Sequence, residues 1–276
     1  MTLSRHCIPC SPHRRITLRH CGSIVGPVVA GHSLGGIAAM ITLQQAVVGY
    51  GGTPLFPPLS GHFAAGSLTA VVGVNGAGKS TLLKTLAGLL PLQSGSLLFS
   101  GNKLPRMAYL PQQAELDRQF PILVSDLVAM GSWPQCGMFR GLNKRAGLQI
   151  VEALDAVGMA SMARSPVGEL SGGQLQRVLF ARLLVQQAPL ILLDEPFTGI
   201  DSATTQLLLQ VIAQLHQQGR TVIAVLHDMS MVANHFPQAL LLTPQCCHWG
   251  DADRVLEHIP ALNVACRPQC LRAVAP

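Results

Sequence analysis

Apolar positions along this chain fall into short unbroken runs that alternate with longer stretches of helical spacing. Residues 67–72, 190–194 and 221–226 are three such runs, rich in aliphatic and β-branched side chains. Unbroken apolar runs of this length are typical of strands that a parallel sheet buries on both faces. The pattern therefore predicts an α/β fold.

The longer stretches repeat their apolar residues at the spacing of an α-helix. This spacing occurs at residues 81–90, 124–130 and 146–159, whereas residues 133–143 are rich in turn formers. We therefore expect a helix directly after the first apolar run and two more on either side of a turn-rich segment.

A glycine-rich segment, residues 73–81, connects the first predicted strand to the first predicted helix. Its glycines allow a tight turn that brings backbone N–H groups close to phosphate oxygens, and the helix N-terminus adds positive potential. Lys79 is expected to reach the β- and γ-phosphates, and the Ser80 hydroxyl to bind Mg²⁺. A glycine-rich turn without a ligand is the alternative. The residues expected to contact ATP here are Gly73, Val74, Asn75, Gly76, Ala77, Gly78, Lys79, Ser80 and Thr81.

Two carboxylates and a histidine follow the other two predicted strands. Asp194 ends its strand, where it is expected to hold Mg²⁺, and Glu195 comes next as a candidate general base for water. His227 follows the strand at 221–226, at the edge where open α/β sheets bind ligands. Without the glycine-rich segment, an acidic pair that caps a loop and an ordinary loop histidine would be the simpler interpretations.

A second short string, Leu170-Ser171-Gly172-Gly173-Gln174, lies about ninety residues after the glycine-rich segment and shortly before the acidic pair. The order of these strings predicts an ATPase. At these residues the chain resembles the nucleotide-binding subunits of ABC transporters, over about residues 41–250. Val74 and Ile200 depart from the family pattern, which more often has proline and leucine there.

This resemblance implies a fold and a domain organisation. The fold is an α/β P-loop NTPase of ABC type: a mixed sheet in a RecA-like core, a small antiparallel β subdomain and an inserted helical subdomain at about residues 113–169. We expect the ATPase domain to span residues 40–250. Residues 1–39 are then a disordered or non-family extension, and residues 251–276 a short C-terminal tail.

The resemblance also implies site residues. Tyr50 matches the aromatic residue that stacks on adenine, and Gln112 matches the glutamine that senses Mg²⁺. Asp201 matches an aspartate between subunits, and His227 the switch histidine. Two copies are expected to dimerise head to tail, so that each ATP contacts the Lys79 segment of one copy. The partner copy's contribution would come from Ser171, Gly172, Gly173 and Gln174.

Residues 113–121 resemble the matching stretch in ATPases of zinc, manganese and iron importers. This resemblance implies a membrane permease and, indirectly, an extracytoplasmic metal-binding protein as partners. The chain would then be peripheral, on the cytoplasmic face of the inner membrane. An ATPase of an iron-chelate or haem importer and a soluble family member that acts on nucleic acid or ribosomes remain as alternatives.

Charge adds little to this interpretation. The first 114 residues hold eight Lys and Arg and no acids, a charge of +8, and the rest hold eleven and thirteen, a charge of −2. A basic half that binds phosphates is expected from this asymmetry. Since no basic stretch is interleaved with aromatic residues, nucleic acid is not an expected partner.

The N-terminal residues and the cysteines admit several interpretations. Gly31-His32-Ser33-Leu34-Gly35 matches a nucleophile elbow, and residues 24–43 carry no charge over nearly the length of a membrane span. We expect neither function, because the sheet is committed to ATP and the stretch contains proline and glycines. Eight cysteines are present, and a Zn²⁺ site is the alternative to reduced thiols. The candidate ligands are His6, Cys7, Cys10, His13, Cys246, Cys247, His248, Cys266 and Cys270.

Overall fold

The structure, a computed structural model, describes residues 39–112, 120–133 and 144–259. The nucleophile-elbow string, the Cys-x-x-Cys string near the N-terminus and most of residues 113–121 lie outside the described residues. So do most of the turn-rich segment at 133–143 and both cysteines after residue 260.

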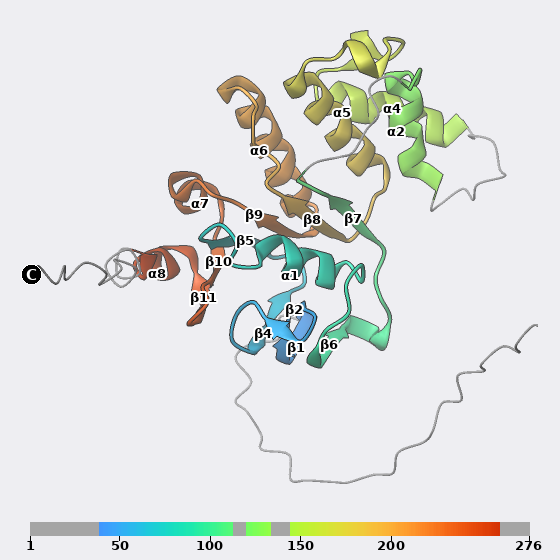
Figure 1. The fold of residues 1–276 in the computed structure, drawn as a ribbon. Helices are drawn as coiled ribbons and strands as arrows, with labels where there is room; N and C mark the ends of the chain where they lie inside the picture. The colour runs from blue at the N-terminus through green and yellow to red at the C-terminus, as the bar shows by residue number, and fades with distance from the viewer. Residues whose placement is uncertain (1–38, 113–119, 134–143, 260–276) are drawn as a thin grey trace, which may run out of the picture. The chain divides into compact units, whose positions relative to one another are not determined.

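A six-stranded mixed sheet forms the centre of the domain (Figure 1). The five strands from β10 to β7 are parallel, and β11 is antiparallel at one edge. The predicted strands at 67–72, 190–194 and 221–226 are confirmed within one residue at each end. The order across the sheet is β11 (Cys247–Asp251), β10 (Gln238–Leu242), β5 (Leu68–Gly73), β9 (Thr221–Val225), β8 (Leu190–Asp194) and β7 (Met107–Leu110).

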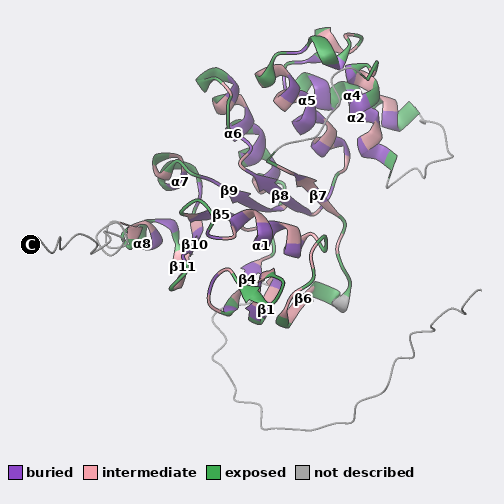
Figure 2. Ribbon diagram, viewed as in Figure 1, coloured by how far each residue is buried: buried purple, intermediate pink, exposed green. Residues whose placement is uncertain are grey.

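The sheet separates two hydrophobic cores, which explains the unbroken apolar runs. Along β8, Ile191 and Leu193 point into one core, and Leu190 and Leu192 point into the other. All five residues of this strand are buried, as Figure 2 shows for the central strands. A strand that is covered on both faces has no position for a polar residue until it ends at Asp194.

Helices form where the sequence predicts helical spacing. The predicted helices at 81–90, 124–130 and 146–159 are observed as α1, α2 and α4, with α1 beginning two residues earlier and ending four residues earlier. Gly88, at φ 72°, follows the end of α1 in a left-handed conformation that terminates the helix. The helices are α1 (Lys79–Leu86), α2 (Val124–Ala129), α4 (Lys144–Ala156), α5 (Gly172–Val185), α6 (Ser202–Gln217), α7 (Met229–His235) and α8 (Ala252–Leu256).

A smaller antiparallel sheet packs on the second core together with α1. Its order is β4 (Leu59–Ala64), β1 (Ala39–Val47) and β6 (Ser94–Phe99), and a short hairpin joins β2 (Gly49–Tyr50) to β3 (Thr53–Pro54). Gln45 adopts a left-handed φ of 46° at an irregularity in the register of β1. This sheet and the packed helices α2, α4 and α5 are the two smaller parts expected beside the central sheet.

Four short 3₁₀ turns complete the described elements: η1 (Ser100–Asn102), η2 (Met130–Ser132), η3 (Ala160–Met162) and η4 (Val167–Glu169).

Within the described ranges, no helix has the length and apolar character needed to cross a bilayer. Residues 39–43, the end of the uncharged stretch, form the start of β1. After β11, helix α8 packs against β10 and β11, so ordered packing continues past Gly250.

Candidate nucleotide-binding site

The carboxyl ends of four parallel strands bring the predicted polar residues to one edge of the sheet. Residues 73–81, here called the phosphate loop, follow β5, and Gln112 follows β7. Asp194 ends β8 before Glu195, and His227 follows β9. A cavity of about 730 Å³ opens at this edge. Its lining residues are Tyr50, Leu55, Asn75, Gly76, Gly78, Lys79, Ser80, Thr81, Gln112, Glu195, Thr198 and His227.

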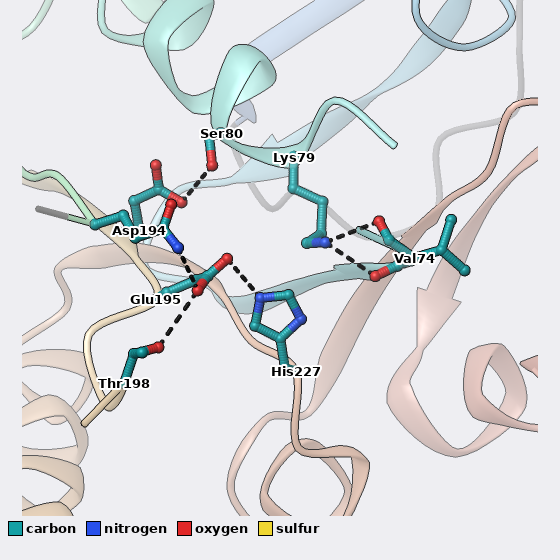
Figure 3. Close-up of polar contacts among 9 residues, drawn as sticks. Val74, Lys79, Ser80, Asp194, Glu195, Thr198 and His227 are labelled. Atoms are coloured by element: carbon teal, nitrogen blue, oxygen red, sulfur yellow. Dashed lines mark hydrogen bonds and ion pairs between the residues drawn. The ribbon is translucent and has the colours of Figure 1, made fainter. Parts of the chain in front are cut away.

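The phosphate loop turns through two left-handed glycines, Gly76 at φ 81° and Gly78 at φ 93°. Lys79 begins α1, and its Nζ donates to the carbonyl oxygens of Gly73 at 2.9 Å and Val74 at 3.0 Å (Figure 3). Burial lowers the pKa of Lys79, whereas the nearby Glu195 and Asp194 carboxylates raise it. The ammonium group is thus held against the loop at the cavity, where a phosphate would meet it.

Ser80 and Asp194 form an oxygen pair at the base of the cavity. The Ser80 hydroxyl donates to Asp194 Oδ1 at 2.9 Å (Figure 3). Asp194 is 1% exposed, and this burial raises the pKa of its carboxyl, an effect that the hydrogen bond from Ser80 opposes. A hydroxyl and a carboxylate side by side are oxygen ligands of the kind that Mg²⁺ takes, so these residues fit the ion that the fold family implies.

Glu195 is fixed by three side chains from three different segments. Its Oε1 contacts His227 Nε2 at 2.5 Å, and its Oε2 accepts from Gln112 Nε2 at 2.7 Å and from Thr198 Oγ1 at 3.3 Å. Figure 3 shows the carboxylate between Thr198 and His227. The backbone of Glu195 adopts a φ of 50°, which is uncommon for a residue other than glycine and is often found at functional sites. These three contacts together fix the orientation of the Glu195 carboxylate.

Tyr50 lies on the β2–β3 hairpin, with its ring 53% exposed at the rim of the cavity. Its hydroxyl accepts a hydrogen bond from Thr81 Oγ1 at 3.4 Å, so the ring stands beside the start of α1. This position is compatible with the stacking on adenine that the resemblance implies.

The string at residues 171–174, here called the signature turn, lies at the start of α5 and lines no part of the cavity. Ser171 is the N-cap: its Oγ accepts from the Gln174 backbone N–H at 3.2 Å, and Gln174 Oε1 accepts from the Ser171 N–H at 2.9 Å. Gly172 and Gly173 form the first turn between them. The structure thus keeps the two glycine-rich motifs apart within one chain.

Asp201 also lies outside the cavity lining. Its carboxylate caps α6 by accepting from the Thr204 backbone N–H and the Thr204 hydroxyl, each at 2.8 Å. These bonds hold the pKa of Asp201 below its usual value.

The remaining residues of the phosphate loop lie as follows: Ala77 is buried, and Gly73 and Val74 contribute the carbonyls that hold Lys79.

Sequence patterns do not predict three side chains that lie at the cavity or contact its carboxylates. Thr198 contacts Glu195, Leu55 lines the cavity, and the Tyr109 hydroxyl donates to Asp194 Oδ2 at 3.4 Å. Tyr109 lies on β7 beside β8, and only the pairing of these strands places it there. The polar tip of Tyr109 in an otherwise apolar strand is the one signal that the sequence offers.

Cys246 and Cys247 are free thiols in the β10–β11 turn region. Burial raises the pKa of the Cys247 thiol to about 11. Across residues 39–112, 120–133 and 144–259, no group of three or more histidine, cysteine or acidic side chains is arranged to hold a metal ion.

Comparisons with known proteins agree with this geometry. The family model described as ABC transporter matches residues 56–198, which include the phosphate loop, the signature turn and Glu195. The manganese transport system ATP-binding protein MntB of Listeria innocua is 37% identical over 218 residues, 78% of this chain and 91% of the relative. The zinc transport system ATP-binding protein TroB of Treponema pallidum is 40% identical over 209 residues, 74% of this chain and 79% of the relative.

Solved structures give the same result. A metal-chelate type ABC transporter in an inward-facing conformation aligns with a TM-score of 0.73 at 29% identity, over 82% of this chain and 89% of that chain. An ATP-binding cassette in its ADP conformation, at 19% identity, supports the fold with a TM-score of 0.70 over 83% of this chain and 99% of that chain. The chain belongs to the ABC transporter family and is one of its ATP-binding ATPases. The resemblance on which the sequence-based prediction rests is confirmed.

Proposed function

We propose that this chain is the ATPase subunit of an importer for a divalent metal ion, zinc or manganese, working as a homodimer beneath a membrane permease. The observation that carries the catalytic part is the Glu195 carboxylate, which lines the phosphate-loop cavity and is fixed there by Gln112, Thr198 and His227. The manganese and zinc transport names of the relatives support the cargo. The proposed location is the cytoplasmic face of the inner membrane.

Each residue of the cavity has a part in the proposed chemistry. Lys79 and the loop N–H groups would bind the phosphates, and Ser80, Asp194 and Gln112 would hold Mg²⁺. When bound, Mg²⁺ neutralises charge on the phosphate oxygens. Glu195 orients water and accepts its proton, and His227, through its contact with Oε1, keeps that carboxylate directed into the cavity.

The proposed head-to-tail dimer is supported by the separation of the two motifs. The signature turn and Asp201 line no part of the chain's own nucleotide cavity. A second copy that presents its signature turn to that cavity would enclose the nucleotide between two subunits. Closure on ATP and reopening after hydrolysis would then drive the permease between two states.

Two related functions are the competing candidates. The first is import of an iron chelate or haem, and the likeness to a metal-chelate type transporter is the observation that supports it. A soluble family member without a permease is the second alternative.

An extracytoplasmic metal-binding protein is a further proposed partner of the importer, because it would deliver the ion to the permease.

The test is uptake in a strain that lacks this gene. The wild-type chain or a Glu195→Gln chain is supplied in trans, and accumulation of zinc, manganese, ferric chelate and haem is compared side by side. The proposal expects that only the wild-type chain restores uptake of zinc or manganese. Restored uptake of ferric chelate or haem alone would replace the cargo, and no uptake defect for any of the four would support a soluble role.

A further inference from the structure

Helix α5 carries two polar side chains that reach across to the segment after the catalytic carboxylate. Gln176 donates from Nε2 to the carbonyl oxygen of Pro196 at 2.7 Å. Arg177 donates to Thr204 Oγ1 from Nη2 at 2.6 Å and from Nε at 3.2 Å. Residues 196–201 are therefore held against α5 near both of their ends.

Thr204 is the central residue of the second attachment. It is 1% exposed, and its hydroxyl donates to Asp201 Oδ2 at 2.8 Å while accepting from Arg177. Its hydrogen-bonding capacity is thus used in both directions within the protein. A Cβ at Gly173 would lie 3.3 Å from Asp201 Oδ2, so the backbone of the signature turn lies directly against the same carboxylate.

The segment that α5 holds is also the segment that touches Glu195. Thr198, in its middle, donates to Glu195 Oε2 at 3.3 Å. A displacement of the Glu195 carboxylate therefore acts on residues 196–201. Helix α5 holds these residues near both ends, and α5 begins with the signature turn. Neither Gln176 nor Arg177 lines the nucleotide cavity.

We propose that Gln176 and Arg177 are positioning residues that tie the signature turn to segment 196–201, so that the state of Glu195 in one nucleotide site sets the signature turn of the other. This inference rests on the proposed head-to-tail dimer. The two side chains act through the segment and the helix, without contact to the nucleotide. The arrangement makes the two sites of a dimer cooperative.

The hydrogen-bonding groups of Arg177 and Thr204 explain why these residue types suit the attachment of α5 to segment 196–201. The guanidinium of Arg177 presents two of its donors to a single buried hydroxyl, a geometry that the single ammonium of lysine does not reproduce. Removing the hydroxyl leaves Arg177 and Asp201 without their shared partner, and hydrogen bonds to charged groups are the costly ones to lose. Thr204→Val is therefore the sharpest substitution, since it removes the hydroxyl and keeps the shape.

The first measurement is ATP-driven dimerisation of the full chain in a Glu195→Gln background, by size exclusion over a range of protein concentrations. Thr204→Val is expected to raise the concentration needed for half dimerisation by about tenfold or more, with ATP binding by the dilute monomer unchanged. Thr204→Ser should behave like the parent. Thr205→Val is the matched control, because among the described residues the Thr205 hydroxyl bonds only to the Asp201 backbone carbonyl, at 3.0 Å.

The second measurement is the dependence of hydrolysis on ATP concentration with Glu195 intact. Thr204→Val and Arg177→Lys should lower the Hill coefficient toward 1, whereas Thr205→Val should keep the wild-type value. Should Thr204→Val fail to fold, Gln176→Glu, which replaces the donor by an acceptor, takes its place, with the exposed Gln210→Glu as control.

Two results would overturn the inference. One is a Thr204→Val chain that dimerises and hydrolyses ATP like Thr205→Val. The other is a lower melting temperature with an unchanged Hill coefficient, which is the signature of a purely structural role. The proposed dimer is tested separately by the Glu195→Gln chain without a second substitution. Failure of that chain to dimerise with ATP would refute the proposed dimer.

Discussion

The two glycine-rich motifs begin helices α1 and α5, and the two helix starts are built differently. Gly78, the N-cap of α1, is left-handed and has no side chain with which to cap the helix. Ser171, the N-cap of α5, forms a complete capping box with Gln174. The first helix start opens into the nucleotide cavity of its own chain, and the second lines no part of it.

This difference indicates what each motif is built to do. A helix start without a side-chain cap has N–H groups available for an anion, and here Lys79 and the Ser80–Asp194 pair surround it. A helix start that caps itself is stable alone and can be presented to another molecule. In the proposed head-to-tail dimer, one chain would therefore contribute two complementary half-sites, and the predictions below test each half separately.

The largest expected effect comes from the phosphate-loop side. Glu195→Gln should keep ATP binding and lower hydrolysis by ~10²-fold or more, because a general base typically contributes 10²–10⁴. Hydrolysis rate and nucleotide binding, measured on the same preparation, check this. Lys79→Ala is the contrasting variant and should weaken binding itself. Wild-type turnover in Glu195→Gln would refute the assignment of the base.

A substitution on the signature side should remove hydrolysis without weakening ATP binding, in contrast to Lys79→Ala. Ser171→Arg is expected to abolish hydrolysis while ATP binding to the isolated subunit stays near normal, since Ser171 lies outside that subunit's cavity. Binding by the dilute monomer and hydrolysis by the concentrated protein give the two values. Mixing this variant with Lys79→Ala should restore at most one competent site per dimer. Full activity of Ser171→Arg would contradict the head-to-tail model.

A smaller effect concerns the buried carboxylate. Burial raises the pKa of Asp194 in the folded chain, so the folded chain holds that proton more tightly than the unfolded chain does. The contribution of the Asp194 carboxyl to the free energy of unfolding is therefore greatest at low pH. It falls as the pH rises from the pKa of this carboxyl in the unfolded chain, about 3.9, to its raised pKa in the folded chain. Without Mg²⁺, Asp194→Asn should melt roughly 2–4 °C higher than wild type at pH 7, the shift that about 1 kcal/mol produces.

Melting temperatures of both chains between pH 4 and pH 8 in a chelating buffer would show this. The difference between them should shrink toward the acidic end, where the wild-type carboxyl is protonated. A difference that stays constant with pH would mean that the substitution acts through packing and not through the charge.

The smallest effect is expected at the N-terminus, outside both half-sites. A chain that begins at Met40 loses only one described residue, Ala39, the first residue of β1. It should fold, hydrolyse ATP and support metal uptake like the full chain, as circular dichroism, activity and uptake assays would show. Loss of folding would mean that residues 1–39 pack on the core. A changed response to added Zn²⁺ would favour a metal site at the N-terminal cysteines.

Much of the fold could be predicted because its signals are local. Strands buried on both faces must be apolar along their whole length, which is why the run that ends at Asp194 stands out. Phosphate-binding turns need glycine at left-handed positions such as Gly76 and Gly78, so the loop also carries a local signature. The end of α1 at Leu86 is less well predicted, because apolar spacing continues past Gly88, the glycine that stops the helix.

The sequence by itself determined the strands, the phosphate loop and the identity of the carboxylates, because these depend on side-chain type and short spacing. Only the tertiary structure decided which groups meet. Tyr109 reaches Asp194 because β7 pairs with β8, and Arg177 reaches Thr204 because α5 lies beside α6. Contacts between residues 27 or 85 positions apart depend on packing geometry, which no local pattern of apolar and polar residues records.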